Sequence, residues 1–319
     1  MKKFIKVLSV SLLAAMLLTS CNSGGSTDDS TTTTTTTTTT EEVKLVSPLV
    51  NYNENAEITV EYKGQSETGN GSVELAVSAA YTLGQKIKIT VPEEQHFIAV
   101  TIAKGVLDES YVYIENGSFE YKIPNFDRAY PSELKTKGST ISARIPTLEE
   151  LTKTHNLALN TCDLVTSTKF FPHATTTNVN NNDAEWQARN VIDGFTQNTG
   201  HGTYPLQSWG PKENLSRNDS ITIDFGHDVL VSEIVISIRA DFPHDGYWDT
   251  CRVYFSDGTY QELSIKGTAK AQKFTIAVDG EAKATSYVKF KNFEKADDSQ
   301  GVWCAWMEVK VNGTEIAPN

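Results

Sequence analysis

The chain has 319 residues, a formal net charge of −12 at pH 7 and hydrophobic residues at 39% of its positions, which is enough for one or two folded domains. An acidic chain is a poor partner for nucleic acid, because the phosphate backbone is itself negative. The four cysteines include no Cys-x-x-Cys pair, and the histidines no His-x-x-x-His pair, so the spacing of a zinc site is missing.

The first twenty residues have the features of an export signal. Lysines at positions 2, 3 and 6 precede an apolar run from Val7 to Leu18, which is too short to span a bilayer comfortably. Residues 18–21, LTSC, resemble a bacterial lipobox, and this resemblance implies cleavage before Cys21 and lipid attachment to it. The alternative is an ordinary secretory signal with Cys21 nearby. Asn22 favours, by the same resemblance, the outer membrane of a Gram-negative bacterium, so we expect a lipid anchor in the cell envelope.

Residues 21–41 are expected to be a disordered linker. Ten consecutive threonines run from Thr31 to Thr40, and the flanking residues are mostly Ser, Gly and Asp. Such a composition contains nothing able to form a core. A flexible tether of about 20 residues would have an average reach of about 25 Å.

Residues 42–150 alternate apolar and polar positions in short runs that are separated by glycine and proline. The runs are EITVEY (57–62), SVELAVSAAY (72–81), KIKITV (86–91), HFIAVTIA (96–103), SYVYI (110–114) and SFEYKIP (118–124). Six or seven short strands in about 100 residues predict an all-β domain, an immunoglobulin-like β-sandwich. Residues 147–150, TLEE, fit a capping box, so a short connecting helix is expected up to about Thr154.

Three strand-like runs lie in residues 220–258. Apolar residues alternate in each run, a polar turn joins the first two, and the loop 240–248, ADFPHDGYW, joins the last two. The middle run ends at Arg239, so a cation, acids, an imidazole and aromatic rings collect in one loop at a strand end. Rigid strands would hold such a loop still, which suits a binding site.

Short motifs follow one another in residues 151–319. They are NLALN (156–160), RNVIDG (189–194), the region of Trp209, DFG (224–226), SDG (256–258) and EVKVNG (308–313). In this order they resemble the discoidin, or coagulation factor 5/8 type C, domain, and most closely its bacterial carbohydrate-binding members of family 32. The resemblance implies a galactose-binding-type, eight-stranded jelly-roll sandwich, with the first and last strands side by side and ligand bound by loops at one end.

The resemblance also implies a ligand site. Its positions in this chain are His201, Arg239, His244 with Asp245, and Trp303, to which Asp241 of the same loop is added. An indole face suits the C–H patch of a sugar ring, while guanidinium, imidazole and carboxylate groups suit its hydroxyls. Arg239 could instead pair with Asp241 or Glu233, and the histidines could be ordinary loop residues. Strand alternation puts Trp303 and Trp306 on different faces, and we expect Trp303 to be the exposed one.

A structural calcium is implied near the Asp-Gly loop, with Asp193, Thr199 and Glu308 in the matching positions, because calcium requires hard oxygen ligands. Phe195 departs from the family pattern, which commonly has an acidic or amide residue there. If the first and last strands pair with Asn156 opposite Gly313, Cys162 comes near Cys304. That disulfide is the first expectation; Cys251 with Cys304, or three buried free thiols, are the alternatives.

The predicted function is a membrane-anchored lipoprotein that binds a glycan or polysaccharide without catalysing a reaction. The first alternative is a surface adhesin that binds a protein or a host glycan. The lesser alternative is a glycan-active enzyme that uses Asp241, Asp245 and Asp249 near His244. These acids crowd one short loop with no second acid across a cleft, which disfavours catalysis.

Overall fold

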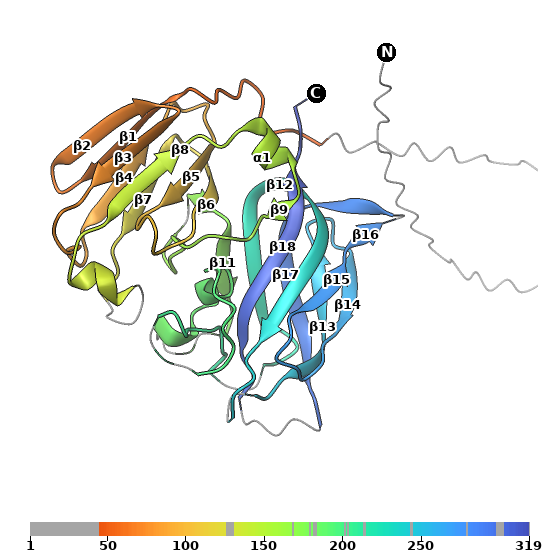
Figure 1. Cartoon of the computed structure of the whole chain (residues 1–319). Helices are drawn as coiled ribbons and strands as arrows, with labels where there is room; N and C mark the ends of the chain where they lie inside the picture. Colours follow the sequence, from red (N-terminus) through yellow and green to blue (C-terminus); the bar gives the residue numbers. More distant parts are fainter. Residues whose placement is uncertain are drawn as a thin grey trace, which may run out of the picture. The chain divides into compact units, whose positions relative to one another are not determined.

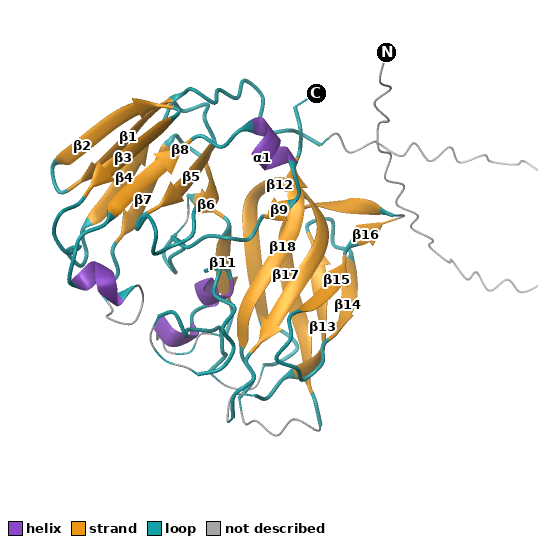
Figure 2. Ribbon diagram, in the orientation of Figure 1, coloured by secondary structure: helices purple, strands orange, loops and turns teal. Residues whose placement is uncertain are grey.

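A computed structural model describes residues 45–125, 131–167, 169–178, 180, 184–200, 202, 204–212, 215–242, 245–278, 280–297 and 303–318. The chain divides into two units, Met1–Val46 and Ser47–Asn319, and all strands described below belong to the second (Figures 1 and 2). Strands dominate it, so the predicted all-β class is confirmed. The signal segment, the Thr-rich linker and Cys21 lie outside the described residues. Within those residues, no helix has the length and apolar character needed to cross a membrane.

The N-terminal sandwich has two sheets, with strand orders β2-β1-β4-β7 and β10-β6-β5-β8-β3. Its own strands are β1 (Glu57–Tyr62), β2 (Gln65–Asn70), β3 (Ser72–Ala76), β4 (Lys86–Thr90), β5 (Phe97–Thr101), β6 (Ser110–Ile114), β7 (Ser118–Lys122) and β8 (Thr140–Arg144). All six predicted runs contain a strand. The strand β2 was not predicted because its sequence, QSETGN, is polar on both faces; it forms an edge, where neither face needs to be buried.

Alternation explains why the other strands of this sandwich form. In β1, Ile58 and Val60 are fully buried while Glu57 and Glu61 are exposed. Each such aliphatic side chain contributes about 1.5–3 kcal/mol by leaving water, so one face of every strand is fixed toward the core. The β1–β2 hairpin turns at Lys63 and Gly64, both with positive φ (49° and 78°), as a two-residue turn between antiparallel strands requires.

The connecting segment contains the predicted capped helix. A 3-10 helix, η1 (Ser132–Lys135), precedes β8, and the helix α1 (Leu148–Thr152) follows it. Thr147 accepts a hydrogen bond from the amide of Glu150, and the Glu150 carboxylate accepts one from the amide of Thr147 at 2.7 Å. The capping box is therefore confirmed, although the helix ends two residues before Thr154. Glu150 also pairs with Arg144 at 2.8 Å, which joins the helix to the N-terminal sandwich.

The C-terminal sandwich is built around one long strand. Its main sheet has the order β14-β13-β17-β12-β18-β9, and β11 and β15 also pair with β12. The elements are β9 (His155–Asn156), β10 (Phe170–Phe171), β11 (His173–Thr176), η2 (Ala184–Trp186), η3 (Ala188–Val191), β12 (Ser220–Ile238), β13 (Trp248–Phe255), β14 (Tyr260–Ser264), β15 (Gln272–Thr275), β16 (Ala277–Val278), β17 (Glu281–Lys295) and β18 (Trp306–Glu315). The first and last strands pair as expected, but Asn156 lies opposite Asn312, one residue from the predicted register.

The polar turn predicted between the first two runs of residues 220–258 is wrong, because both runs belong to β12. The pairing register shifts between Asp224 and Val229, and Gly226 has a φ of +74°. A Cβ at Gly226 would lie 2.4 Å from the ring of Phe171, so only glycine fits there. The strand bends at this bulge, pairs with β11 in its first half and reaches β15 and β18 in its second.

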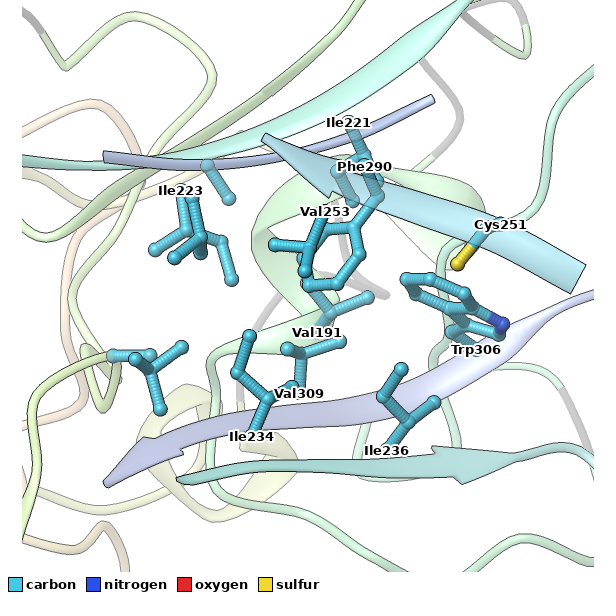
Figure 3. Close-up of a cluster of buried hydrophobic side chains, with 14 of the residues drawn as sticks. Val191, Ile221, Ile223, Ile234, Ile236, Cys251, Val253, Phe290, Trp306 and Val309 are labelled. Carbon is cyan, nitrogen blue, oxygen red and sulfur yellow. The ribbon is translucent and has the colours of Figure 1, made fainter. Parts of the chain in front are cut away.

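The core of this sandwich is a cluster of buried side chains, and Figure 3 shows Ile234, Ile236 and Val309 on one side of it and Ile221, Val253 and Phe290 on the other. Trp209 and Trp306 are both fully buried. Their backbones form a bridge, in which each amide donates to the other residue's carbonyl at 2.8–2.9 Å. Trp209 therefore lies in the core of the C-terminal sandwich.

The three described cysteines are buried free thiols, so the predicted Cys162–Cys304 disulfide is wrong, as is its rival. Cys304 belongs to the core of the C-terminal sandwich, whereas Cys162 belongs to the core of the N-terminal one. The register argument failed because β9 ends at Asn156. The chain then leaves the sheet that contains β18, and Cys162 packs beside the N-terminal strands instead.

Candidate functional site

Three segments meet where β18 begins, at the end of the C-terminal sandwich opposite to β9. The amide of Arg239 donates to the carbonyl of Ala305 at 3.0 Å, and the amide of Ala240 donates to the carbonyl of Asn198 at 2.8 Å. A parallel bridge joins Gly246 to Cys304. Residues 198–200, 239–242, 245–246 and 303–305 therefore form one rim. His201 and His244 belong to the same stretches of sequence but lie outside the described residues.

The rim exposes two aromatic side chains. Trp303, which precedes β18, is 51% exposed, whereas Trp306 at the start of β18 is fully buried, which confirms the predicted difference in exposure. Phe242 is 74% exposed, the largest exposure of an aromatic side chain in the described residues. Phe242 is not among the site residues predicted from the sequence. The sequence does contain a signal for its exposure. Phe242 lies in the polar loop ADFPHDGYW directly after an acid, and a side chain that packs in the core is not expected in such a loop.

Arg239 lies beneath this rim and pairs with Asp241, which is the alternative that the sequence left open, while its predicted ligand contact stays a prediction. Its side chain has no solvent exposure, and its Nε and Nη2 donate to the carboxylate of Asp241 at 2.8–3.0 Å. Nη2 also donates to the carbonyl of Gly200 at 2.7 Å, and the guanidinium lies 5.6 Å from the ring centroid of Trp186. Burial lowers the pKa of Arg239, while Asp241 opposes that change. The guanidinium thus ties the rim segments together.

Asp241 and Asp245 of the loop differ in whether their carboxylate oxygens already have hydrogen-bond donors. Both oxygens of Asp241 accept from Arg239, so this carboxylate is already engaged. Asp245 Oδ1 is buried without a hydrogen-bond partner, and the residue is partly exposed. A buried acceptor without a donor is unfavourable unless a ligand or water supplies one. Asp245 therefore has acceptor capacity at the rim. Its predicted ligand contact stays a prediction.

A second acidic pair, Asp193 and Glu308, lies inside the same sandwich. Asp193 Oδ1 accepts from the amide of Phe195 at 3.0 Å, and Glu308 Oε2 accepts from the amide of Gly194 at 3.2 Å. The other oxygens, Asp193 Oδ2 and Glu308 Oε1, are buried and have no partner. Burial raises the pKa of Asp193 to about 8. Burial, with the negative charge of Asp193, raises the pKa of Glu308 well above its usual value.

These two carboxylates fit a hard cation. Each presents one oxygen that no donor satisfies, and a calcium ion would satisfy both. The part of the chain that the structure describes has no group of three or more His, Cys, Asp or Glu side chains that could hold a metal. Further ligands would have to be carbonyl, hydroxyl or water oxygens. Thr199 is exposed, and no described contact joins its side chain to the pair, so its part in such a site stays a prediction.

Comparison with known families assigns this half of the chain. Residues 173–309 match the model of the F5/8 type C domain. The C-terminal sandwich is an F5/8 type C domain. The match covers the rim segments, the Asp193–Glu308 pair and β12, so the predicted family is confirmed. A search of curated protein sequences gave no match.

Solved structures similar to this F5/8 type C domain have low sequence identity. One is the family 32 carbohydrate-binding module of NanJ from C. perfringens in complex with galactose, at 16% identity, with 44% of this chain and 91% of that chain covered and a TM-score of 0.33. A second is the C-terminal domain of a chitobiase from Bacteroides fragilis, at 17% identity, with 45% and 91% covered and a TM-score of 0.32. A third is chitosan-binding module 2 of a Paenibacillus sp. IK-5 chitosanase/glucanase in complex with chitotriose, at 16% identity, with 49% and 98% covered and a TM-score of 0.34.

Proposed function

We propose that this protein binds carbohydrate at the rim of its F5/8 type C domain. The observation that carries the proposal is the pair of exposed aromatic side chains, Trp303 and Phe242, on segments that the Gly246–Cys304 bridge joins. Exposed apolar side chains that gather beside polar groups are typical of a ligand-binding surface. The acceptor oxygen of Asp245 in the same loop adds the polar group that would orient a hydroxyl.

This combination suits a sugar ring better than a purely apolar ligand. A pyranose offers a patch of C–H bonds that an indole or phenyl face can cover, and hydroxyls that need directional acceptors. Each hydroxyl exchanges water for protein, so the net gain is only about 1 kcal/mol per hydrogen bond. We therefore expect weak binding, in the micromolar to millimolar range, with selectivity set by the position of the acceptors.

Binding without turnover is the reading that the acids support. Both oxygens of Asp241 accept hydrogen bonds from Arg239, so this carboxylate is already engaged within the protein. Asp245 is then the acid of this loop that has an oxygen without a hydrogen-bond partner. Glycoside hydrolysis ordinarily needs two carboxyl groups, one on each side of the bond that is cleaved. Arg239 and Asp241 serve the proposed site by fixing the segments that present Trp303 and Phe242.

We also propose a structural calcium and a lipid anchor. Asp193 and Glu308 would hold the cation, which would neutralise two buried carboxylates and brace the Gly194 turn below the rim. Lipid on Cys21 would tether the binding domain to the cell envelope, as the lipobox-like sequence suggests. Loss of labelled fatty acid from a Cys21→Ser chain would test the anchor; retained label would refute it.

The test uses the chain without residues 1–41 and a panel of immobilised polysaccharides. Trp303→Ala should weaken retention by about tenfold or more, because exposed aromatic anchors carry most of the energy of such sites. Tyr260→Ala is the matched control, because Tyr260 is equally exposed at 51% but lies on β14, away from the rim. Both variants should keep the thermal midpoint within about 2 °C.

Three results would overturn the proposal. Equal losses of retention for the Trp303 and Tyr260 variants would remove the rim as the site. Retention of a protein ligand with no glycan retained would favour the adhesin alternative. New reducing ends that appear with the wild-type chain would mean that the protein is an enzyme.

A further inference from the structure

The two sandwiches share a sheet and a core. Strand β10 belongs to the segment that leads into the F5/8 type C domain, yet it pairs with β6, with Phe170 opposite Ile114 and Phe171 opposite Tyr113. The N-terminal core includes Phe170 and Cys162 among its buried members. The amide and hydroxyl of Thr161 also bond to Ser110. The N-terminal sandwich is therefore completed by residues that come after it in the sequence.

A loop of the F5/8 type C domain docks on the same core. We call residues 193–205 the Asp193 loop; positions 201 and 203 lie outside the described residues. Phe195 and Tyr204 of this loop meet edge to face, with ring centroids 4.9 Å apart and planes at 86°, and both pack against the N-terminal core. A Cβ on Gly194 would come within 3.7 Å of a carboxylate oxygen of Asp108, which belongs to the N-terminal sandwich.

The surroundings of the Tyr204 hydroxyl show how deep this contact is. The hydroxyl oxygen is buried and has no hydrogen-bond partner. Burial raises the pKa of Tyr204, and the charges of Asp193, Glu133 and Asp108 raise it further. Glu133 lies in η1 and Asp108 precedes β6, so acids of both sandwiches affect this hydroxyl.

The other side of the Asp193 loop holds the binding rim. The carbonyl of Gly200 accepts from Arg239, and the carbonyl of Asn198 accepts from the amide of Ala240. At its start, the amide of Gly194 donates to Glu308 of β18. One loop of a dozen residues thus lies between the N-terminal core and the segments that present the exposed aromatics.

We propose that Phe195 and Tyr204 are positioning residues through which the N-terminal sandwich sets the Asp193 loop, so that both sandwiches build one binding end. An apolar ring at position 195 is what this docking requires. An acidic or amide side chain, which the family resemblance leads one to expect at position 195, would not pack against the apolar N-terminal core. The part of the N-terminal sandwich that Phe195 and Tyr204 contact thus supports the loop that holds the rim.

The test follows two amides, one at the start of the Asp193 loop and one in the rim, by native-state hydrogen exchange in the chain without residues 1–41. They are the amides of Gly194 and Ala240, whose acceptors are Glu308 and Asn198. Phe195→Ala should speed exchange at both amides by about tenfold or more, because removing a packed ring leaves the loop without its support. Phe195→Leu, which keeps an apolar side chain, should restore most of the protection.

Val60→Ala is the matched control, because Val60 is a fully buried member of the same core but lies in β1 of the other sheet. It should lower the global stability of the protein. Exchange at the amides of Gly194 and Ala240 should then increase no more than exchange at the amides of the strands. Unchanged exchange in Phe195→Ala would refute the positioning role. Equal acceleration in Val60→Ala would also refute it, because the effect would then be global destabilisation.

The part of this inference that concerns ligand rests on the proposed carbohydrate site, and a parallel retention assay separates the two. Phe195→Ala should weaken glycan retention by about tenfold, and Val60→Ala by less than about twofold. If the wild-type chain retains no glycan while the exchange result holds, the proposed ligand fails and the positioning role stands. If retention is normal in Phe195→Ala, the coupling between the sandwiches is refuted.

Discussion

The buried carboxyl pair makes the metal-free protein sensitive to pH in an unusual direction. The pKa of Asp193 is raised from 3.8 to about 8 by burial, and that of Glu308 is raised as well. A carboxyl group with a raised pKa in the folded state stabilises the fold below its unfolded pKa, and that stability is lost as the pH rises through the folded pKa. Metal-free protein should therefore become less stable between about pH 4 and pH 8.

The size of the effect follows from the number of protons. Where the folded chain holds one more proton than the unfolded chain, each pH unit costs about 1.4 kcal/mol. Between about pH 5.5 and pH 7.5 the loss is about 3 kcal/mol, which corresponds to a fall in thermal midpoint on the order of 5–10 °C. Asp193→Asn keeps an acceptor for the amide of Phe195 and removes the proton of residue 193, so its midpoint should fall less, and the remaining fall comes from the raised pKa of Glu308.

The assay is differential scanning calorimetry of both proteins in chelator across this pH range. His173 also has a raised pKa, because Asp163 outweighs the effect of burial, and its stabilisation is likewise lost as pH rises. Comparison with Asp193→Asn removes that contribution, since both proteins contain His173. Equal pH slopes in the two proteins would refute the assignment of the raised pKa to the pair.

Calcium provides the second arm of the same experiment. At about pH 7.5, where the metal-free pair carries its highest cost, calcium at about 100 times its Kd should raise stability by about 2.7 kcal/mol in the wild type. Asp193→Asn and Glu308→Gln should gain little. A wild-type midpoint that falls with pH as expected but does not respond to calcium would leave the buried pair intact and eliminate the cation.

Three further predictions concern other parts of the chain. Arg239→Met should destabilise the fold by about 3–5 kcal/mol in urea unfolding, because Asp241 would lose the partner that compensates its burial; a change under about 1 kcal/mol would contradict the buried ion pair. The hydrogen bond from Arg144 lowers the pKa of Glu150 to about 2, so its stabilisation is present above about pH 4.5 and is lost as pH falls toward 2. Because Glu150 is about one-third exposed, Glu150→Gln should reduce the loss of unfolding free energy between about pH 4.5 and pH 2 by about 1 kcal/mol or less. If that loss is the same in both proteins, the Arg144–Glu150 pair does not cause it. Cys162, Cys251 and Cys304 should be unreactive to Ellman's reagent in the native chain without residues 1–41, because all three are buried. After denaturation without reductant, three thiols per chain should react. One reactive thiol per chain would indicate a disulfide.

The sequence determined the local features of this protein. Alternation with a period of two fixed which residues of β1, β4 and β7 face a core, because successive side chains of a strand point to opposite faces. The same rule separated exposed Trp303 from buried Trp306. The capping box at Thr147 was readable because its hydrogen bonds span only three residues. The order of short motifs was sufficient to identify the F5/8 type C domain.

Only the tertiary structure decided the features that depend on distant contacts. Arg239 is typical of a loop in sequence, yet it is buried because the carbonyl of Gly200 and the Asp241 carboxylate close over it. Cys162 belongs to a core made by strands that end before it, and Phe195 packs on that same core. No local sequence pattern predicts these placements. They depend on apolar surface that the two sandwiches bury against each other, and the residues involved are far apart in the sequence.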